Sequence, residues 1–220
     1  MENNTLLGRD LDDFEISYSM IGRQRAVMPD VYCGDALSGI EIKLEMHEDP
    51  EYKTDGKITV ATAHIVRIPS SDTIVNQKAY GLDYDMYDML DECGDVDLRT
   101  VAAEFNSSPN CDVCIAVNDN DIYYVQKFVV NNKFRNQGVG TFCMQMLPKW
   151  IRAIYGGYRS IISLIPGPIE CDKENKTKYN KEKRRLVNFY KRVGFKNLKP
   201  RSGVLYYIFP EDEYTTEEED

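Results

Sequence analysis

The residues from 135 to 140, RNQGVG, have the composition of a turn that binds an anion. They follow an apolar stretch rich in β-branched and aromatic residues (121–130) and precede a stretch with helical apolar spacing (141–157). Glycines at 138 and 140 let the backbone approach a ligand closely. The N–H groups and the positive dipole at the start of a helix suit a phosphate or diphosphate, and Arg135 can add a charge-assisted hydrogen bond.

Two common nucleotide-binding motifs do not fit this turn. A Rossmann fingerprint needs three glycines as GxGxxG directly after the strand, and a P-loop needs Lys followed by Ser or Thr, where this chain has Thr141 and Phe142. The turn does match the pattern R/Q-x-x-G-x-G/A at Arg135, Gly138 and Gly140. In this it resembles the acetyl-coenzyme A signature of the Gcn5-related N-acetyltransferases (GNAT).

A second segment, 186–196, reads LVNFYKRVGFK and is similar to the F-Y-x-x-x-G-F of that family. There Gly194 would end a helix, and Phe189 and Phe195 would pack in the core. Apolar strands are expected at 159–166, beside strand 121–130, and at 203–209. The order of strand, turn, helix, strand, helix and strand supports the resemblance from about residue 111 to residue 209.

The resemblance implies a single α/β (α+β) domain with a mixed, mostly antiparallel central sheet flanked by helices. We assign it to residues 36–209, with the coenzyme-binding core at about 111–209, and leave 1–35 unassigned. Further predictions rest on patterning. They are an antiparallel hairpin of 40–49 with 57–69, two short helices in 84–105, a strand at 112–117 and a disordered acidic tail at 210–220.

Composition agrees with one domain that is not membrane-bound. The chain has 220 residues with 42% apolar content, and no apolar run is long enough for a membrane span. Because the N-terminus lacks the basic-then-apolar order of a secretory signal, we expect a cytoplasmic protein. The six cysteines are scattered, and Cys111-x-x-Cys114 has no second pair and no nearby histidine, so no metal site is expected.

Charge is segregated along the chain. The net charge is −9, and residues 211–220 alone hold seven acids. Residues 83–97 hold seven more without a Lys or Arg, whereas 173–201 hold twelve Lys or Arg against two acids. These segments are either solvated faces or surfaces that attract the coenzyme's phosphates and a cationic acceptor. Nucleic-acid binding is not expected, because the chain is acidic overall and its basic stretch lacks interleaved aromatic residues.

The resemblance implies transfer of an acetyl group from acetyl-coenzyme A to a primary amine by direct attack in a ternary complex. Tyr190 would protonate the leaving thiolate, and a backbone N–H near Val129 or Val130 would stabilise the oxyanion. The pantetheine arm would follow the end of the strand, and the pyrophosphate would bind the turn. The residues assigned to the coenzyme are Phe128, Val129, Val130, Arg135, Asn136, Gln137, Gly138, Val139, Gly140 and Thr141.

The general base is left open. Many relatives carry a glutamate on the motif strand, where this chain has no carboxylate beyond Asp121, so a water relay, Asp121, Glu104 or His64 would have to serve. The stretch 166–185 is expected to separate the third core strand from its helix, either as a lid or acceptor loop or as disorder.

The acceptor is expected to be a polyamine, an aminoglycoside or a protein amine. The missing strand glutamate and the acidic tail motivate an alternative, a non-catalytic GNAT-like binding module that engages a protein partner. A homodimer through exposed strand edges is also expected, although nothing in the sequence specifies which edge is free.

Overall fold

The computed structural model describes residues 5–10, 13–22, 38–47, 56–68, 121–155, 161–169, 175–200 and 203–209. The predictions for 84–105 and 112–117 lie outside these ranges. So do those for Glu104, the Cys111 and Cys114 pair, the acidic segment 83–97 and the tail 210–220.

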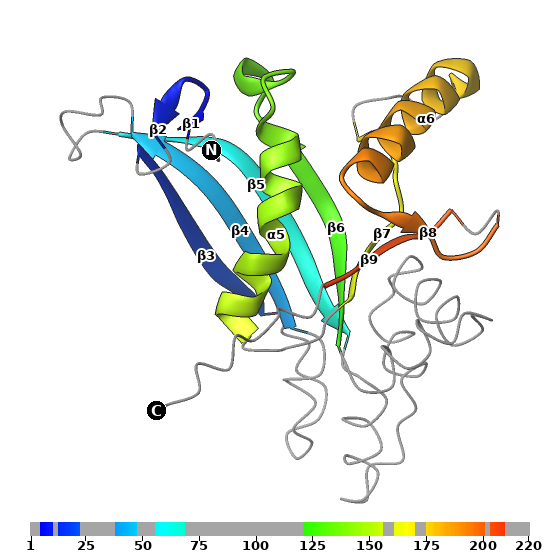
Figure 1. Cartoon of the computed structure of the whole chain (residues 1–220), viewed down its shortest axis with the longest axis horizontal. Helices are drawn as coiled ribbons and strands as arrows, with labels where there is room; N and C mark the ends of the chain where they lie inside the picture. Colours follow the sequence, from blue (N-terminus) through cyan, green and yellow to red (C-terminus); the bar gives the residue numbers. More distant parts are fainter. Residues whose placement is uncertain are drawn as a thin grey trace, which may run out of the picture.

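The centre of the molecule is a seven-stranded sheet in the order β3-β4-β5-β6-β7-β9-β8 (Figure 1). Its strands are β3 (Phe14–Gly22), β4 (Ser38–His47), β5 (Lys57–Ile68), β6 (Ile122–Val130), β7 (Ile161–Leu164), β8 (Lys196–Asn197) and β9 (Leu205–Ile208). Neighbouring strands are antiparallel except β6 and β7, which are parallel. The predicted mixed, mostly antiparallel sheet is confirmed.

The N-terminal half of the sheet contains the predicted β4–β5 hairpin, in which Ile42 opposes Ala63. It also contains β3, which lies within the segment that the sequence left unassigned and which pairs with β4 along its whole length. A small hairpin of β1 (Thr5–Leu6) and β2 (Arg9–Asp10) precedes it, and Arg9 donates to the carbonyl of His47 at 3.0 Å. The sheet therefore begins before residue 36.

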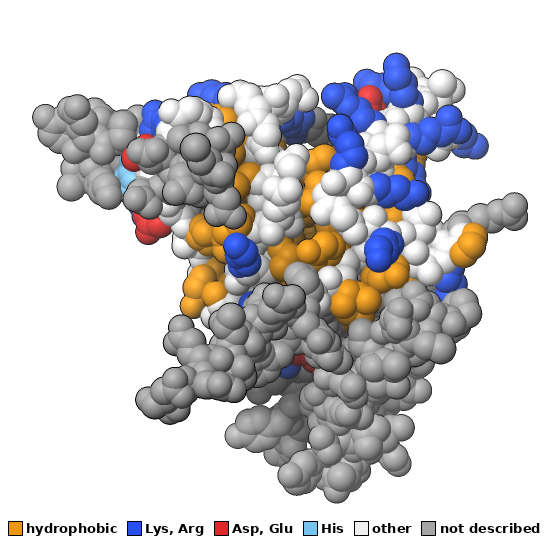
Figure 2. Space-filling view, in the orientation of Figure 1, with side chains coloured by type: hydrophobic (Ala, Val, Ile, Leu, Met, Phe, Trp, Pro, Cys, Tyr) orange, Lys and Arg blue, Asp and Glu red, His pale blue; other side chains and the backbone are white. Residues whose placement is uncertain are grey.

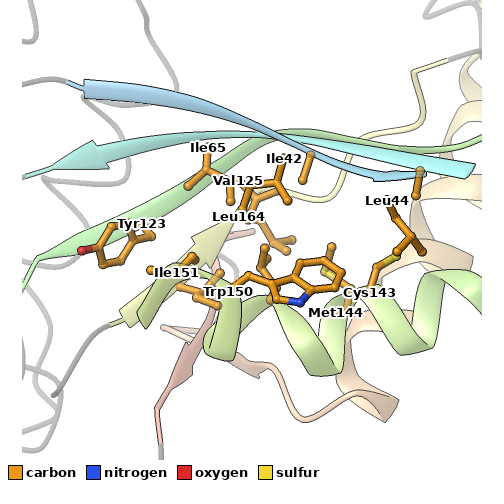
Figure 3. Close-up of a cluster of buried hydrophobic side chains, with 14 of the residues drawn as sticks. Ile42, Leu44, Ile65, Tyr123, Val125, Cys143, Met144, Trp150, Ile151 and Leu164 are labelled. Atoms are coloured by element: carbon orange, nitrogen blue, oxygen red, sulfur yellow. The ribbon is translucent and has the colours of Figure 1, made fainter. Parts of the chain in front are cut away.

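Helix α5 (Val139–Tyr155) covers one face of the sheet (Figure 1). Its buried side chains recur at helical spacing, as a helix with one apolar face requires. Figure 3 shows them meeting the strand side chains Ile42, Leu44, Ile65 and Val125. The buried residues of α5 are Val139, Cys143, Met144, Leu147, Trp150 and Ile151.

Helix α6 (Lys176–Arg192) contacts the core mainly through its C-terminal half, and of its side chains Tyr190 is buried. Asn175 caps its start by accepting from the Lys178 N–H at 3.1 Å. Gly194, with φ of +112°, ends it as predicted. The expectation of a long loop over 166–185 is wrong for 176–185, which are helical. Lys, Arg and Glu residues, which favour helix, and the Asn175 cap stabilise these turns. They were not predicted because this stretch has no clear apolar periodicity.

Candidate functional site

Strands β6 and β7 run side by side only over a short stretch. Their register joins Ile122–Tyr124 to Ile161–Ser163. On the other side, β5 pairs with β6 all the way from Ile122 to Val130. From Val125 onward, therefore, β6 has a strand neighbour on one edge only among the residues that the structure describes.

The register shows which backbone groups face this open edge. The N–H of Asn131 donates to the carbonyl of Val60 on β5 at 2.9 Å. Backbone groups of successive residues point to opposite edges of a strand. Val129 therefore also faces β5, whereas Phe128 and Val130 present their N–H and C=O groups to the open edge. Of the two predicted oxyanion donors, the register favours Val130.

Arg135 fastens the turn to the end of β6. Its Nε donates to the carbonyl of Val130 at 3.0 Å, and the side chain is half-buried. This contact, which the sequence did not predict, keeps the guanidinium charge at the point where the open edge ends. Arg135 thus has a structural role there in addition to any role toward an anion.

The turn between β6 and α5 is held by its own amide side chains. Asn131 accepts from the Lys133 N–H at 3.1 Å and donates to the Thr59 carbonyl at 3.1 Å. Gln137 donates to the Lys133 carbonyl at 2.9 Å. Asn136 has φ of +61°, a left-handed conformation that Asn tolerates better than most residues. These contacts preform the turn.

The start of α5 offers backbone donors toward solvent. The first intrahelical hydrogen bond of α5 runs from the Phe142 N–H to the Gly138 carbonyl at 3.0 Å. The N–H groups of the three preceding residues, Val139–Thr141, therefore lack an intrahelical acceptor. Gly138 and Thr141 are exposed and Gly140 is half-buried. This is the local geometry that suits a phosphate group.

The two glycines of the motif serve different purposes. Gly138 has φ of +85°, and a Cβ built there would meet no atom within 4 Å. At Gly140 a Cβ would lie 3.4 Å from Cζ of Phe189 and 3.7 Å from Cγ2 of Val130. Gly138 is thus required by backbone conformation. Gly140 lets β6, α5 and α6 meet at one point.

Tyr190 lies in an aromatic cluster on α6 next to this junction. Its ring packs edge-on against Phe189 at 5.0 Å and Phe195 at 5.7 Å between centroids. The predicted core packing of these two phenylalanines is confirmed. Burial raises the pKa of the Tyr190 hydroxyl to about 12, so it keeps its proton at neutral pH.

The two base candidates in the described ranges have different partners. Asp121 accepts from Nε of Arg67 at 2.6 Å, so its carboxylate is held by a permanent cation. His64 Nε2 lies 3.0 Å from Oε1 of Glu41. The pKa of Glu41 is lowered mainly by its hydrogen bond from Lys43, so Glu41 stays anionic beside the imidazole.

His64 also occupies a distinctive place in the sheet. It opposes Lys127 on β6, and the register shifts between His64 and Ile65. Its neighbours Ala63 and Ile65 face the core beneath α5, so His64 lies on the opposite face. Sequence reasoning missed the Glu41 partner, although Glu41 and Lys43 share a face at strand spacing.

The outer side of α6 is strongly basic. The helix holds eight Lys or Arg and one Glu, and Figure 2 shows the cationic side chains gathered over it. An open hollow of about 610 Å³ on this side is lined by Arg185, Asn188, Lys191 and Arg192. The predicted charge segregation is therefore confirmed for this segment.

Within the described ranges, no helix is long and apolar enough to cross a membrane. The same residues contain no group of three or more His, Cys, Asp or Glu side chains placed to hold a metal ion.

No protein-family model matches the chain, and no curated protein matches it either. Among solved structures, a chain of the crystal structure of the KacTA-DNA complex is similar, with 10% sequence identity and a TM-score of 0.37. The superposition covers 88% of this chain and 93% of that chain. A similarity at this level is no basis for assigning an activity.

Proposed function

We propose that this chain is an N-acetyltransferase that moves an acetyl group from acetyl-coenzyme A to a primary amine. The observation that carries the proposal is that the parallel strands β6 and β7 stop pairing at Val125. Beyond this point the edge of β6 that has no neighbour among the described strands leads toward the N-terminus of α5. Acetyl-coenzyme A has an arm with amide groups and a diphosphate at its far end. The amides suit an open strand edge, and the diphosphate suits a helix N-terminus.

In this proposal the chain holds the coenzyme largely with its backbone. The N–H and C=O groups of Phe128 and the N–H of Val130 bind the pantetheine amides at this edge of β6. The N–H groups of Val139–Thr141 bind the diphosphate, and Arg135 adds positive charge beside it.

Tyr190 is assigned the role of general acid. As the amine nitrogen bonds to the carbonyl carbon and the carbon–sulfur bond breaks, the leaving thiolate takes the phenol proton. A hydroxyl that stays protonated up to a pKa of about 12 is in the right state for this step throughout the neutral range.

We assign removal of the amine proton to His64, directly or through a water molecule. Asp121 is bound to Arg67, whereas the His64 ring is oriented by Glu41 and lies on the face of the sheet away from α5. Tyr190 as the acid and His64 as the base would then act from opposite faces of the sheet, where β6 and β7 diverge. His64→Gln should lower kcat with coenzyme affinity unchanged, and added imidazole should restore part of it. A variant with parental kcat would rule the assignment out.

The experiment that tests the coenzyme site is calorimetric titration with acetyl-coenzyme A. Thr141→Glu places a carboxylate among the proposed phosphate donors, at a helix start where an acid otherwise stabilises the fold. It should weaken binding by at least about tenfold, or roughly 1.4 kcal/mol. Gln145→Glu, exposed one turn further along the same helix, carries the same charge and should bind like the parent.

If the folded parent does not bind the coenzyme, the enzyme proposal fails, and the alternative of a binding module for a protein partner takes its place. If it binds as expected, acetylation of spermidine, kanamycin and a lysine peptide identifies the acceptor class.

A further inference from the structure

The two edges of the central sheet are built differently. The edge strand β8 has two residues, Lys196 and Asn197, and both are exposed. A short, charged strand of this kind resists pairing with another chain. The opposite edge strand, β3, has nine residues. It contains no Pro and no Lys, and among the described residues no strand pairs with its outer edge.

An apolar row runs along β3 on the face that α5 covers. Ile16, Tyr18 and Met20 are 42%, 59% and 58% exposed. They alternate with polar residues and share a face with Phe14, which packs against the core. Figure 2 shows hydrophobic side chains exposed beside α5 on this side of the molecule. In the part of the chain that the structure describes, a backbone edge without a strand neighbour thus coincides with an exposed row of apolar side chains.

The row is symmetric about its middle residue. Tyr18 is the central residue of β3, with Ile16 and Met20 two positions to either side. In an antiparallel pair of β3 strands related by a two-fold axis at Tyr18, Ile16 would oppose Met20 of the partner subunit, and Tyr18 would oppose its own copy. On the other face, Ser17 would oppose Ser19 of the partner subunit.

Charge does not oppose this pairing. The only charged side chain of β3 is Glu15, near one end of the strand. It accepts from Nζ of Lys57 at 2.6 Å, so its charge is compensated within the same copy. The central positions that would face each other are uncharged.

We propose that a second copy of this chain binds here, with the two β3 strands pairing antiparallel around Tyr18 into one continuous sheet. The contact consists of one strand and one row of side chains. It therefore belongs at the small end of the size range for specific interfaces, and the dimer should dissociate on dilution.

Sedimentation equilibrium over a wide dilution series tests the proposal. The parent should shift from the 25.3 kDa monomer toward twice that mass as concentration rises. Tyr18→Lys places two like charges at the axis and should stay monomeric at every concentration. Ile169→Lys is the matched control, because Ile169 is also 59% exposed but lies after β7, away from this edge.

Cysteine cross-linking tests the register. Opposed residues of an antiparallel pair have Cα atoms about 4.5–5.5 Å apart, within reach of a disulfide. Under mild oxidation Tyr18→Cys should form a covalent dimer beyond any seen for the parent. Met20→Cys should not, because it would oppose Ile16 of the partner subunit.

A parent that is monomeric at all concentrations would overturn the proposal, and so would a dimer that persists in Tyr18→Lys. If Tyr18→Lys fails to fold by circular dichroism, the cysteine pair decides. Cross-linking of Tyr18→Cys alone supports the register, and equal cross-linking of both variants or of neither rejects it. None of these outcomes depends on coenzyme binding.

Discussion

The residues of the motif turn illustrate how one sequence pattern combines separate physical requirements. Gly138 is needed for its left-handed φ, and Gly140 for its contact with Phe189. Arg135 and Gln137 are anchored to backbone carbonyls of the same region. A sequence motif can therefore reflect local folding as well as ligand contact, and substitutions are needed to separate the two.

Gly138→Ala should lower the free energy of unfolding by about 1 kcal/mol, because a Cβ disfavours the left-handed conformation even where space is open. Gly138→Asn should cost less, since Asn tolerates that region. Urea denaturation of the three proteins measures the difference. Equal stability of the alanine and asparagine variants would contradict the conformational explanation.

Tyr190→Phe should lower turnover while the dissociation constant for acetyl-coenzyme A stays the same. The phenyl ring keeps the contacts with Phe189 and Phe195, so the fold should be retained. Steady-state kinetics with an identified acceptor, together with calorimetry, separates the two effects. Unchanged turnover would leave Tyr190 with a packing role only.

At the scale of the elements, the decisive feature is the divergence of β6 from β7. The pairing of β5 with β6 continues to Val130, whereas among the described strands β7 pairs with β6 only up to Tyr124. Helix α5 begins just beyond that edge. The strand, the turn and the helix therefore form one surface on which an extended ligand with a diphosphate can lie.

Backbone hydrogen exchange followed by NMR tests this arrangement residue by residue. Acetyl-coenzyme A should slow exchange at Phe128 and Val130, whose N–H groups face the opening. It should change Val129 little, because that N–H already faces β5. Equal protection of all three amides, or of none, would contradict the proposed course of the ligand along β6.

At the scale of the whole molecule, charge and core occupy separate regions. Helix α6 carries eight basic residues in a chain with a net charge of −9, and they lie outside the core. Among the residues that the structure describes, the core contains the Cys143 thiol and the Tyr190 hydroxyl. Burial raises the pKa of the Cys143 thiol from 9.0 to about 12 and that of the Tyr190 hydroxyl from 10.0 to about 12.

These two groups predict a loss of stability in alkaline solution. Between about pH 9 and 12 the unfolded chain releases protons that the folded chain keeps, so the free energy of unfolding falls as pH rises through that window. Tyr190→Phe should make the fall shallower above pH 10, because it removes this buried hydroxyl. Denaturation series at several alkaline pH values measure the slopes. Parallel curves for parent and Tyr190→Phe would contradict the burial of this hydroxyl.

Several local elements could be predicted from the sequence. Alternation gave the β4–β5 hairpin. Helical spacing with two glycines gave the turn and α5, and Gly194 gave the end of α6. Such features depend on residues close together in the chain, so their physical causes can be read there. The first turns of α6 were missed because they show no apolar periodicity. β3 was missed although Phe14, Ile16, Tyr18 and Met20 alternate with polar residues, a pattern from which this strand could have been predicted.

How these elements pack against one another could not be predicted from the sequence and is seen in the fold. The divergence of β6 from β7 depends on strands separated by a helix, and the contact of Gly140 with Phe189 joins α5 to α6. The ion pair of Asp121 with Arg67 and the hydrogen bond of His64 with Glu41 are likewise non-local. Which distant residues become neighbours is set by packing of the whole sheet, and no short stretch of sequence specifies it.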